Sequence, residues 1–440
     1  YLFTADALAG KWAEYQAQFL DQNPVTILEN QQVRLRVSYK ETPVMTEQVV
    51  ISAIGLPEGK TAQINLNDSE GNQFSVELKE SEDTHQALPI NRQYQVNTVS
   101  FTIDGKTYVA ESSLNGFLLQ KDKPLNLVIN YNTQNTQFVA YWGGWNNYTL
   151  TPLAESKVTV VNLSFADIKL ENGNYRVDTS VSGYLTDVPR ANSQIWPNYQ
   201  TWTQYAHAHP ETKFMLSVGG ATFSRIWTQL LTVESVEAIA DSLVDKLTIK
   251  YPVYSGNFAR AEEKIGEIEL AGIDLDVEAS GQRVDERISR NVIALIKALK
   301  ARAPNKLITF AGFSVGADPE GQCTVPGSVH CGEDRQILQQ AGQLLNWVNV
   351  MAYDAGEAYA RKDYQIALQN YAGLIGKQKT YLGLDLQPQW GVAVPETPEQ
   401  LAEKAKWAVE HGYGGVMLWA IINHSVNPYN YVMAISKSIS

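Results

Sequence analysis

The sequence predicts an α/β protein in which an N-terminal all-β, sandwich-like domain precedes a TIM (β/α)8 barrel. Two observations lead to this fold class. The chain has 440 residues, which is too long for one ordinary domain and fits two. The pattern of apolar residues also changes near residue 131, from short alternating runs to strands that alternate with helical segments. We therefore expect an accessory domain over residues 1–131 and a barrel over residues 132–440.

The accessory domain begins with a segment of helical character, so a short leading helix is expected over residues 6–19. Short alternating runs follow, separated by turn signals such as Glu70-Gly71-Asn72. The runs cover residues 33–39, 49–54, 62–66, 74–78, 94–103, 108–111 and 125–131. This spacing is typical of a small antiparallel β-sandwich. A spacer or a carbohydrate-binding module would fit such a domain, and no motif decides between them.

A polar linker over residues 132–135 leads into the predicted barrel. Eight candidate strands then alternate with helical stretches over about 300 residues, which is the pattern of a TIM barrel. The strands cover residues 138–142, 158–165, 213–218, 270–278, 307–312, 347–353, 380–384 and 415–419. The helical stretches include residues 235–246, 286–302, 335–345, 364–374 and 398–410. Catalytic groups of such barrels lie at the C-terminal ends of the strands.

The fourth candidate strand carries three acids, Asp274, Asp276 and Glu278, in alternation with apolar residues. A strand has a side-chain period of two, so the three acids share one face. Parallel strands are usually buried on both faces, and burying unpaired charges is costly. Mutual repulsion also raises at least one carboxyl pKa, as a general acid at neutral pH requires. These acids therefore indicate a catalytic site at the barrel mouth rather than a solvated strand face.

Composition and charge restrict the partners of this chain. The net charge is −12 and the pI about 5.1, which argues against nucleic acid and anionic membranes and suits a neutral substrate. No apolar run reaches about 18 residues, so no transmembrane span is expected. The 10 Trp and 22 Tyr residues supply rings that can stack on sugar faces. A monomer is expected.

The two cysteines, Cys323 and Cys331, lie close together in a loop that contains Pro and Gly. This suits a local disulfide and hence an exported protein, while two cytosolic thiols remain an alternative. The sequence starts at Tyr1 without a signal-peptide pattern and looks like a mature or trimmed chain. Secretion is therefore expected from the cysteines alone.

The acidic strand resembles the fourth strand of a glycoside hydrolase family 18 chitinase, which carries the motif D-G-x-D-x-D-x-E. Residues 271–278 read Ala-Gly-Ile-Asp-Leu-Asp-Val-Glu, so the last three acids of the motif match. Ala271 stands in place of the leading Asp, and Val277 in place of a frequent Trp. We expect the change at Ala271 to alter packing rather than to abolish activity, because the three acids that face the substrate in the family are retained.

Three other strands carry further motifs of the family. The third-strand motif S-x-G-G appears as residues 217–220, and the sixth-strand motif M-x-Y-D as residues 351–354. The eighth-strand Trp appears as Trp419, and the first strand ends in the similar sequence Ala-Tyr-Trp-Gly-Gly-Trp at residues 140–145. The resemblance covers residues 136–440 and points to a chitinase of the bacterial type, with a β-rich module before the barrel.

The resemblance implies retaining hydrolysis of β-1,4 bonds between N-acetylglucosamine units of chitin or chitooligosaccharides, with the substrate's own N-acetyl oxygen as nucleophile. Glu278 would protonate the leaving oxygen and later act as base on water. Asp276 would hydrogen-bond the acetamide N–H, and Asp274 would share a proton with Asp276. Tyr353 would donate to the acetamide oxygen.

Substrate binding is implied for several more residues. Trp419 would form the floor under the N-acetyl methyl group, and Asp354 would contact the same sugar. The other substrate-binding candidates are Ser217, Trp142 and Met351, with Trp145, Tyr148 and Trp227 as further rings for stacking. Taken singly, Tyr353 and Trp419 fit plain barrel core equally well, and Ser217 could be a strand-end cap. No cofactor and no metal are expected.

Only residues 385–414 separate the last two candidate strands. Some family members carry a large α+β module there, and this chain has no room for it. An open groove with endo-type cleavage is therefore expected.

Three other readings remain. The first is an endo-β-N-acetylglucosaminidase that acts on glycoprotein N-glycans with the same acids. The second is a non-catalytic chitin-binding lectin, which ranks low because Glu278 is present. The third is a carboxylate–metal enzyme, which has little support because only His207 and His209 are close in sequence and no H-x-x-x-H occurs.

Overall fold

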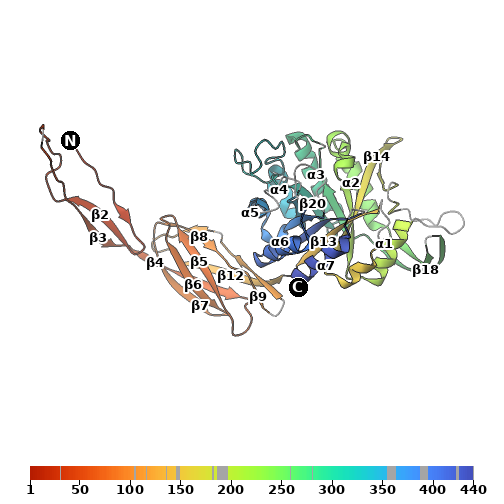
Figure 1. Ribbon diagram of the computed structural model, residues 1–440, viewed down its shortest axis with the longest axis horizontal. Coiled ribbons are helices and arrows are strands. Elements are labelled where there is room, and N and C mark those ends of the chain that lie inside the picture. Colours follow the sequence, from red (N-terminus) through yellow and green to blue (C-terminus); the bar gives the residue numbers. More distant parts are fainter. Residues whose placement is uncertain are drawn as a thin grey trace. The chain divides into compact units, whose positions relative to one another are not determined.

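The protein divides into two compact units, Tyr1–Gln134 and Asn135–Ser440 (Figure 1). The computed structural model describes residues 1–29, 31–103, 106–114, 116–134, 136–144, 149–180, 183–185, 197–257, 259–279, 281–353, 363–386, 395–422 and 426–439. The division falls beyond the expected end of the accessory domain at residue 131. The expected polar linker is instead the end of a strand, β12 (Leu125–Gln134).

Two sheets enclose the core of the N-terminal unit. One has the order β7-β4-β12-β10-β9 and the other the order β11-β8-β5-β6, with β12 and β4 as a parallel pair and the other pairs antiparallel. The strands are β4 (Thr46–Ile54), β5 (Thr61–Asp68), β6 (Gln73–Lys79), β7 (Asp83–Pro89), β8 (Gln93–Asn97), β9 (Phe101–Ile103), β10 (Lys106–Ser112) and β11 (Gly116–Leu118), in addition to β12. Of these, β7 and β11 lie outside the strands expected from the sequence.

The helix expected over residues 6–19 is wrong. This segment forms β1 (Leu8–Ala9) and β2 (Ala13–Phe19), and β3 (Val37–Pro43) completes an antiparallel sheet of three strands. Every second residue of β2 from Ala13 is apolar, and Phe19 pairs with Val37 across the sheet. This period-two alternation outweighs the local helix propensity of the intervening Glu and Gln residues.

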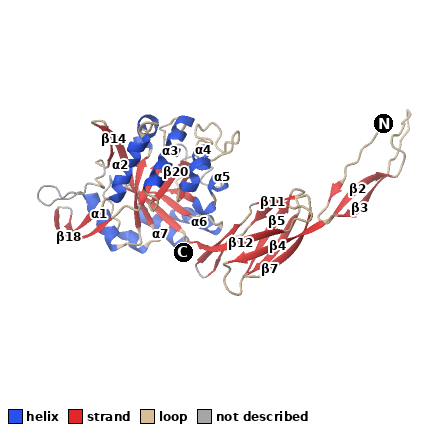
Figure 2. Ribbon diagram, turned by 180° about the vertical axis from the view of Figure 1, so that it is seen from behind, coloured by secondary structure: helices blue, strands red, loops and turns tan. Residues whose placement is uncertain are grey.

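The C-terminal unit is a closed parallel barrel, which confirms the predicted TIM fold (Figure 2). The strand order is β13-β23-β22-β21-β20-β19-β16-β14, and pairing of β13 with β14 closes the ring. The barrel strands are β13 (Gln137–Gly143), β14 (Val160–Glu171), β16 (Lys213–Gly219), β19 (Gly272–Asp276), β20 (Leu307–Phe313), β21 (Trp347–Met351), β22 (Thr380–Asp385) and β23 (Gly415–Ile421). Helices lie around the outside of this ring.

The expected helices are confirmed and others are added. The helices are α1 (Pro197–Ala208), α2 (Val236–Thr248), α3 (Glu286–Arg302), α4 (Arg335–Ala341), α5 (Asp363–Ile375), α6 (Pro398–Glu410) and α7 (Pro428–Ser438). The short helical turns are η2 (Thr151–Glu155), η4 (Ala221–Phe223), η5 (Ile226–Leu230), η6 (Gly342–Leu344) and η8 (Lys377–Lys379). The strands β15 (Asn174–Asp178), β17 (Tyr251–Asn257) and β18 (Arg260–Ile268), together with α1 and α7, were not predicted. Within the ranges given above, none of the helices has the length and apolarity to cross a bilayer.

Each barrel strand presents alternate residues to the helices and to the barrel interior. Ile273 and Leu275 of β19 belong to the large core between strands and helices. Tyr141 and Met417 belong to a separate cluster in the interior of the barrel. Because the side-chain period is two, Asp274 and Asp276 face the interior.

Candidate active site

Asp274 is the centre of a hydrogen-bond network inside the barrel. Its carboxylate is fully buried. Its Oδ2 accepts hydrogen bonds of 2.7 Å from the hydroxyl groups of both Tyr141 and Ser217. Its Oδ1 accepts from Thr309 Oγ1 at 2.6 Å and from Asn349 Nδ2 at 3.3 Å. Four strands other than its own therefore hold this carboxylate in one orientation.

The strand register brings these donors together. Ser217, Asp274 and Thr309 are paired across three adjacent strands, so their inward side chains lie side by side. Asn349 is oriented by Trp347, whose Nε1 donates to the Asn349 Oδ1 at 3.1 Å. Burial raises the pKa of Asp274 above its ordinary value, and the hydrogen bonds from Thr309 and the other three donors oppose this increase.

Asp276 lies one inward position closer to the mouth and is 4% exposed. Burial, and then the negative charges of Glu278 and Asp274, raise its pKa well above the ordinary value. Its Oδ1 is buried and accepts no hydrogen bond from the described part of the chain. A buried carboxyl oxygen normally has a partner, so Asp276 is available to hydrogen-bond a ligand that enters the barrel.

Glu278 is partly exposed and lies two residues beyond the end of β19, although the sequence predicted a strand that included it. Side-chain exposure therefore increases along the row, from the fully buried Asp274 through Asp276 to Glu278. An acid at the outer end of such a row can exchange protons with solvent, while the inner pair is kept from water.

The S-x-G-G motif allows the end of β16 to lie close to β19. Gly219 has a φ of +108°, and a Cβ there would lie 2.2 Å from the Asp276 carbonyl oxygen and 2.7 Å from the Trp227 indole. The same carbonyl accepts hydrogen bonds from the backbone N–H of Gly220 at 3.0 Å and from Trp227 Nε1 at 2.9 Å. Only glycine fits here, and Ser217 of the same motif holds Asp274.

An aromatic floor lies opposite the acid row in the barrel. The partly exposed Trp419 stacks on Phe165 with ring centroids 5.4 Å apart, and its ring meets that of Tyr141 edge-on at 5.6 Å. Met351 belongs to the same interior cluster, and Tyr353 packs against it. Trp419, Met351 and Tyr353 thus all lie on the inner side of the barrel, as a substrate site requires.

The structure corrects two of the predicted aromatic substrate contacts. Trp142 is fully buried in the core between strands and helices, where its ring lies 5.4 Å from that of Tyr184. Its neighbour Tyr141 faces the interior instead, because successive side chains point to opposite sides of a strand. Trp227 is also fully buried and cannot stack on a sugar. Asp354, Trp145 and Tyr148 lie outside the described residues.

Three residues that hold Asp274 were missed in the sequence: Tyr141, Thr309 and Asn349. Each is an inward-facing polar residue of its strand, flanked by residues that pack against the helices. An isolated polar residue inside an otherwise apolar barrel strand was the available signal. Its significance depends on knowing which face of the strand is inward.

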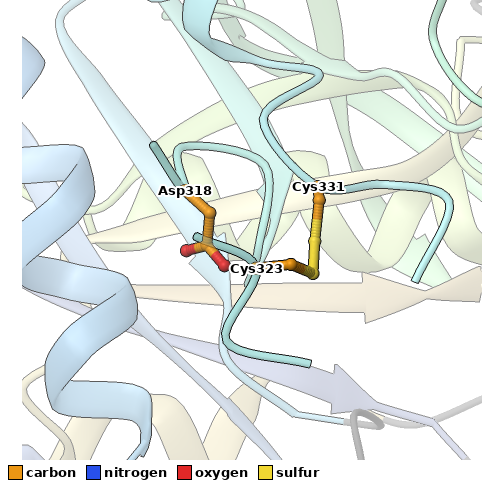
Figure 3. Close-up of side chains that lie close together, drawn as sticks. All are labelled: Asp318, Cys323 and Cys331. Carbon is orange, nitrogen blue, oxygen red and sulfur yellow. A yellow bond between two sulfur atoms is a disulfide. The ribbon is translucent and has the colours of Figure 1, made fainter. Parts of the chain in front are cut away.

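The two cysteines form a disulfide, Cys323–Cys331, which favours the first of the two alternatives left open above. Figure 3 shows Asp318 beside them, with ligand atoms of the three side chains within 4.8 Å of one another. Both sulfur atoms are bonded to each other, so neither is a thiolate ligand. The Asp318 carboxylate accepts hydrogen bonds from Thr324 and Asn370, so it serves to fix this loop.

A row of inward-facing carboxylates with an aromatic floor at the mouth of a TIM barrel fits a glycoside hydrolase. The sequence model of the glycosyl hydrolases family 18 matches residues 137–379, which are 243 of the 440 residues. The chain belongs to this family. The predicted family is thereby confirmed.

Two of the similar solved structures share the fold with TM-scores of at least 0.50, at low sequence identity. A family 18 chitinase from Pseudoalteromonas aurantia is 19% identical with a TM-score of 0.50, covering 69% of this chain and 100% of that one. The cell-surface chitinase ChiW of a Paenibacillus species is 15% identical with a TM-score of 0.51, covering 89% of this chain and 51% of that one. A fungal family 18 endo-β-N-acetylglucosaminidase is 18% identical with a TM-score of 0.46, covering 69% of this chain and 98% of that one. No curated protein matches the chain.

Proposed function

We propose that the chain is an endo-acting chitinase that cleaves β-1,4 bonds between N-acetylglucosamine units with retention of configuration. The observation that carries this proposal is the buried Asp276 oxygen, which has no hydrogen-bond partner in the described chain and lies between Asp274 and Glu278. An acetamide N–H of the substrate would be the missing partner.

The acid row divides the chemistry between its members. Glu278, the outermost acid, protonates the leaving oxygen and then deprotonates the attacking water. Asp276 hydrogen-bonds the acetamide N–H, so that the acetamide oxygen attacks the anomeric carbon and the resulting positive charge is stabilised. Asp274 shares a proton with Asp276 as a coupled pair, since two carboxylates so close and so buried cannot both be ionised at low cost.

The remaining roles concern position. Tyr353 holds the acetamide oxygen beneath the anomeric carbon, and Trp419 supports the methyl group as an apolar floor. Ser217 acts through Asp274 rather than on the sugar. In the described residues between β22 and β23 the only helix is α6, which supports an open groove and endo cleavage. The disulfide supports secretion.

The proposal is tested by hydrolysis of a chromogenic chitobioside, with wild-type protein and Glu278→Gln assayed in the presence and absence of EDTA. We expect turnover that survives EDTA and falls by about 10²- to 10⁴-fold in the variant, as loss of a general acid requires. Glu286→Gln, at the exposed start of α3, is the matched control and should retain full activity.

The outcomes separate the alternatives. Tight binding of chitooligosaccharides without turnover by the wild type would identify a lectin. Release of N-glycans from a glycoprotein without chitobioside turnover would identify an endo-β-N-acetylglucosaminidase. Processive release of disaccharide from one end of a long soluble chitin derivative would contradict the endo mode alone.

A further inference from the structure

A second carboxylate position at the barrel mouth lies apart from the acid row. Asp385 is the last residue of β22 and is 6% exposed. Leu382 and Leu384 of this strand pack in the core between strands and helices, whereas Tyr381 belongs to the interior cluster. The side-chain period of two therefore directs Asp385 to the interior, at the C-terminal end of its strand where TIM-barrel sites lie.

Asp385 lies beside the aromatic floor of the proposed site. Its Cα is paired with that of Trp419 on β23, and the following N–H, from Leu386, donates to the Trp419 carbonyl at 2.9 Å. On the other side, Leu382 of β22 is paired with Val350 of β21. Asp385 thus lies at the end of its strand beside Trp419 of the aromatic floor.

Asp385 lies apart from the catalytic acids. β20 and β21 lie between β22 and β19 in the barrel. The charges that raise the pKa of Asp276 are those of Glu278 and Asp274. Asp385 is therefore not among the groups that raise the pKa of Asp276. The oxygens of its carboxyl group can accept hydrogen bonds from a ligand.

We infer that Asp385 is a substrate-binding residue that accepts a hydrogen bond from a hydroxyl group of the N-acetylglucosamine unit lying on Trp419. This inference rests on the proposed function. An internal β-1,4-linked unit has free hydroxyl groups only at C3 and C6, because its O1 and O4 are in glycosidic bonds and C2 carries the acetamide. The partner of Asp385 is therefore one of these two hydroxyl groups. A site built to bind a substrate hydroxyl discriminates strongly against an analogue that lacks it.

The test combines a variant with two altered substrates. Wild-type protein and Asp385→Asn are assayed on a chromogenic chitobioside and on its 3-deoxy and 6-deoxy analogues, modified in the sugar that bears the chromophore. We expect Asp385→Asn to lower kcat/KM on the parent substrate by about 10- to 100-fold, as for a hydrogen bond to a charged group. For the wild type, kcat/KM on one of the two deoxy analogues should be lower than on the parent substrate by a similar factor. On that analogue, Asp385→Asn should have the same kcat/KM as the wild type.

The acidic limb of the pH profile serves as a second readout. The acidic limb should be the same in Asp385→Asn and the wild type, because Asp385 is not one of the residues that raise the pKa of Asp276. Asp318→Asn is the matched control, since Asp318 is also a buried aspartate, in the loop that follows β20, and its carboxylate is held by Thr324 and Asn370. We expect this control to have a lower melting temperature than the wild type and the same selectivity among the three substrates.

Each outcome decides the inference. A variant within twofold of the wild type on the parent substrate, or an equal further loss on both deoxy analogues, overturns it. If Asp385→Asn does not fold, the wild type alone still tests it, because equal turnover of all three substrates excludes a hydroxyl contact. Absence of wild-type turnover on the parent substrate overturns the proposed function, and this inference with it.

Discussion

The phenolic hydroxyl of Tyr141 donates a 2.7 Å hydrogen bond to Oδ2 of Asp274, across the barrel from β13 to β19. Both side chains face the interior of the barrel, and neither is exposed. The bond stabilises the ionised form of Asp274 in surroundings that otherwise favour the protonated form. In the proposed mechanism, Tyr141 thereby influences where the proton of the Asp274–Asp276 pair resides.

Tyr141→Phe is expected to raise the pKa of Asp274 further, because it removes a donor that lowers it. The acidic limb of kcat/KM should move to higher pH, and kcat/KM should fall by about 10- to 100-fold, as for a hydrogen bond to a charged group. Tyr381→Phe is the control, since Tyr381 also faces the interior but is not a donor to Asp274. An unchanged acidic limb in Tyr141→Phe would contradict this role.

Asp276→Asn is expected to lose hydrolysis and to gain stability at neutral pH. Burial and the nearby charges raise the Asp276 pKa in the folded state, so the folded protein binds this proton more tightly than the unfolded chain does. The free energy of unfolding therefore falls as the pH rises from about 3.9 toward the folded-state pKa, by at most about 1.4 kcal/mol per pH unit. Asparagine cannot ionise and removes this loss.

The measurement is the melting temperature of wild type and Asp276→Asn at pH 4 and pH 7. The advantage of the variant should be larger at pH 7. Asp245→Asn, on the exposed face of α2, controls for the loss of one negative charge and should follow the wild type at both values. The prediction would be contradicted if the melting temperatures of the wild type and Asp276→Asn changed by the same amount between pH 4 and pH 7.

Gly219→Ala is expected to be severely destabilising and inactive. Its Cβ would overlap the Asp276 carbonyl oxygen at 2.2 Å, and its φ is +108°. Gly281→Ala is the matched control, because Gly281 also has a positive φ, of +74°, but no atom within 4 Å of the added carbon. We expect a cost of about 1–2 kcal/mol for the control from backbone strain alone, and several times that cost for Gly219→Ala. Chemical denaturation of both variants checks this, and equal losses would show that the contact with Asp276 is unimportant.

Arg92→Met is expected to destabilise the N-terminal unit by about 3–5 kcal/mol, because it leaves the buried Asp68 carboxylate without its cation. Arg92 Nη1 lies 2.6 Å from Asp68 Oδ2, with both side chains almost completely buried. Arg36→Met breaks an ion pair with Asp21 in which the arginine side chain is 67% exposed, and should cost at most about 1 kcal/mol. Calorimetry distinguishes the two variants. Hydrolysis of short chitooligosaccharides should survive both, and loss of that activity in Arg92→Met would show that the barrel depends on the first unit.

Replacing both Cys323 and Cys331 by Ser is expected to cost about 2–3 kcal/mol of stability, from the loop entropy of a bridge between residues 8 apart in sequence. A reducing agent should lower the melting temperature of the wild type by a similar amount and leave that of the double variant unchanged. A reducing agent that affects both proteins equally would show that the bridge is not the source of the stability.

The sequence by itself determined the barrel and its acid row. Both can be predicted from local periodicity. Segments with the period of strands alternate with segments with the period of amphipathic helices, and the spacing of Asp274, Asp276 and Glu278 places them on one face of a strand. The glycines of the S-x-G-G motif could also be recognised, because a tight approach of backbone requires glycine whatever surrounds it. The same periodicity was misread over residues 6–19, where strand pairing with β3 outweighs helix propensity.

Only the tertiary structure decided which face of each strand is inward and how deeply each acid is buried. Adjacent residues such as Tyr141 and Trp142 point to opposite sides, and closure of the barrel assigns Tyr141 to the site and Trp142 to the helix-packed core. The donors to Asp274 come from strands far apart in sequence, so no local pattern predicts their meeting. Burial in turn determines the raised pKa of Asp276, because the desolvation that favours its protonated form exists only in the closed barrel.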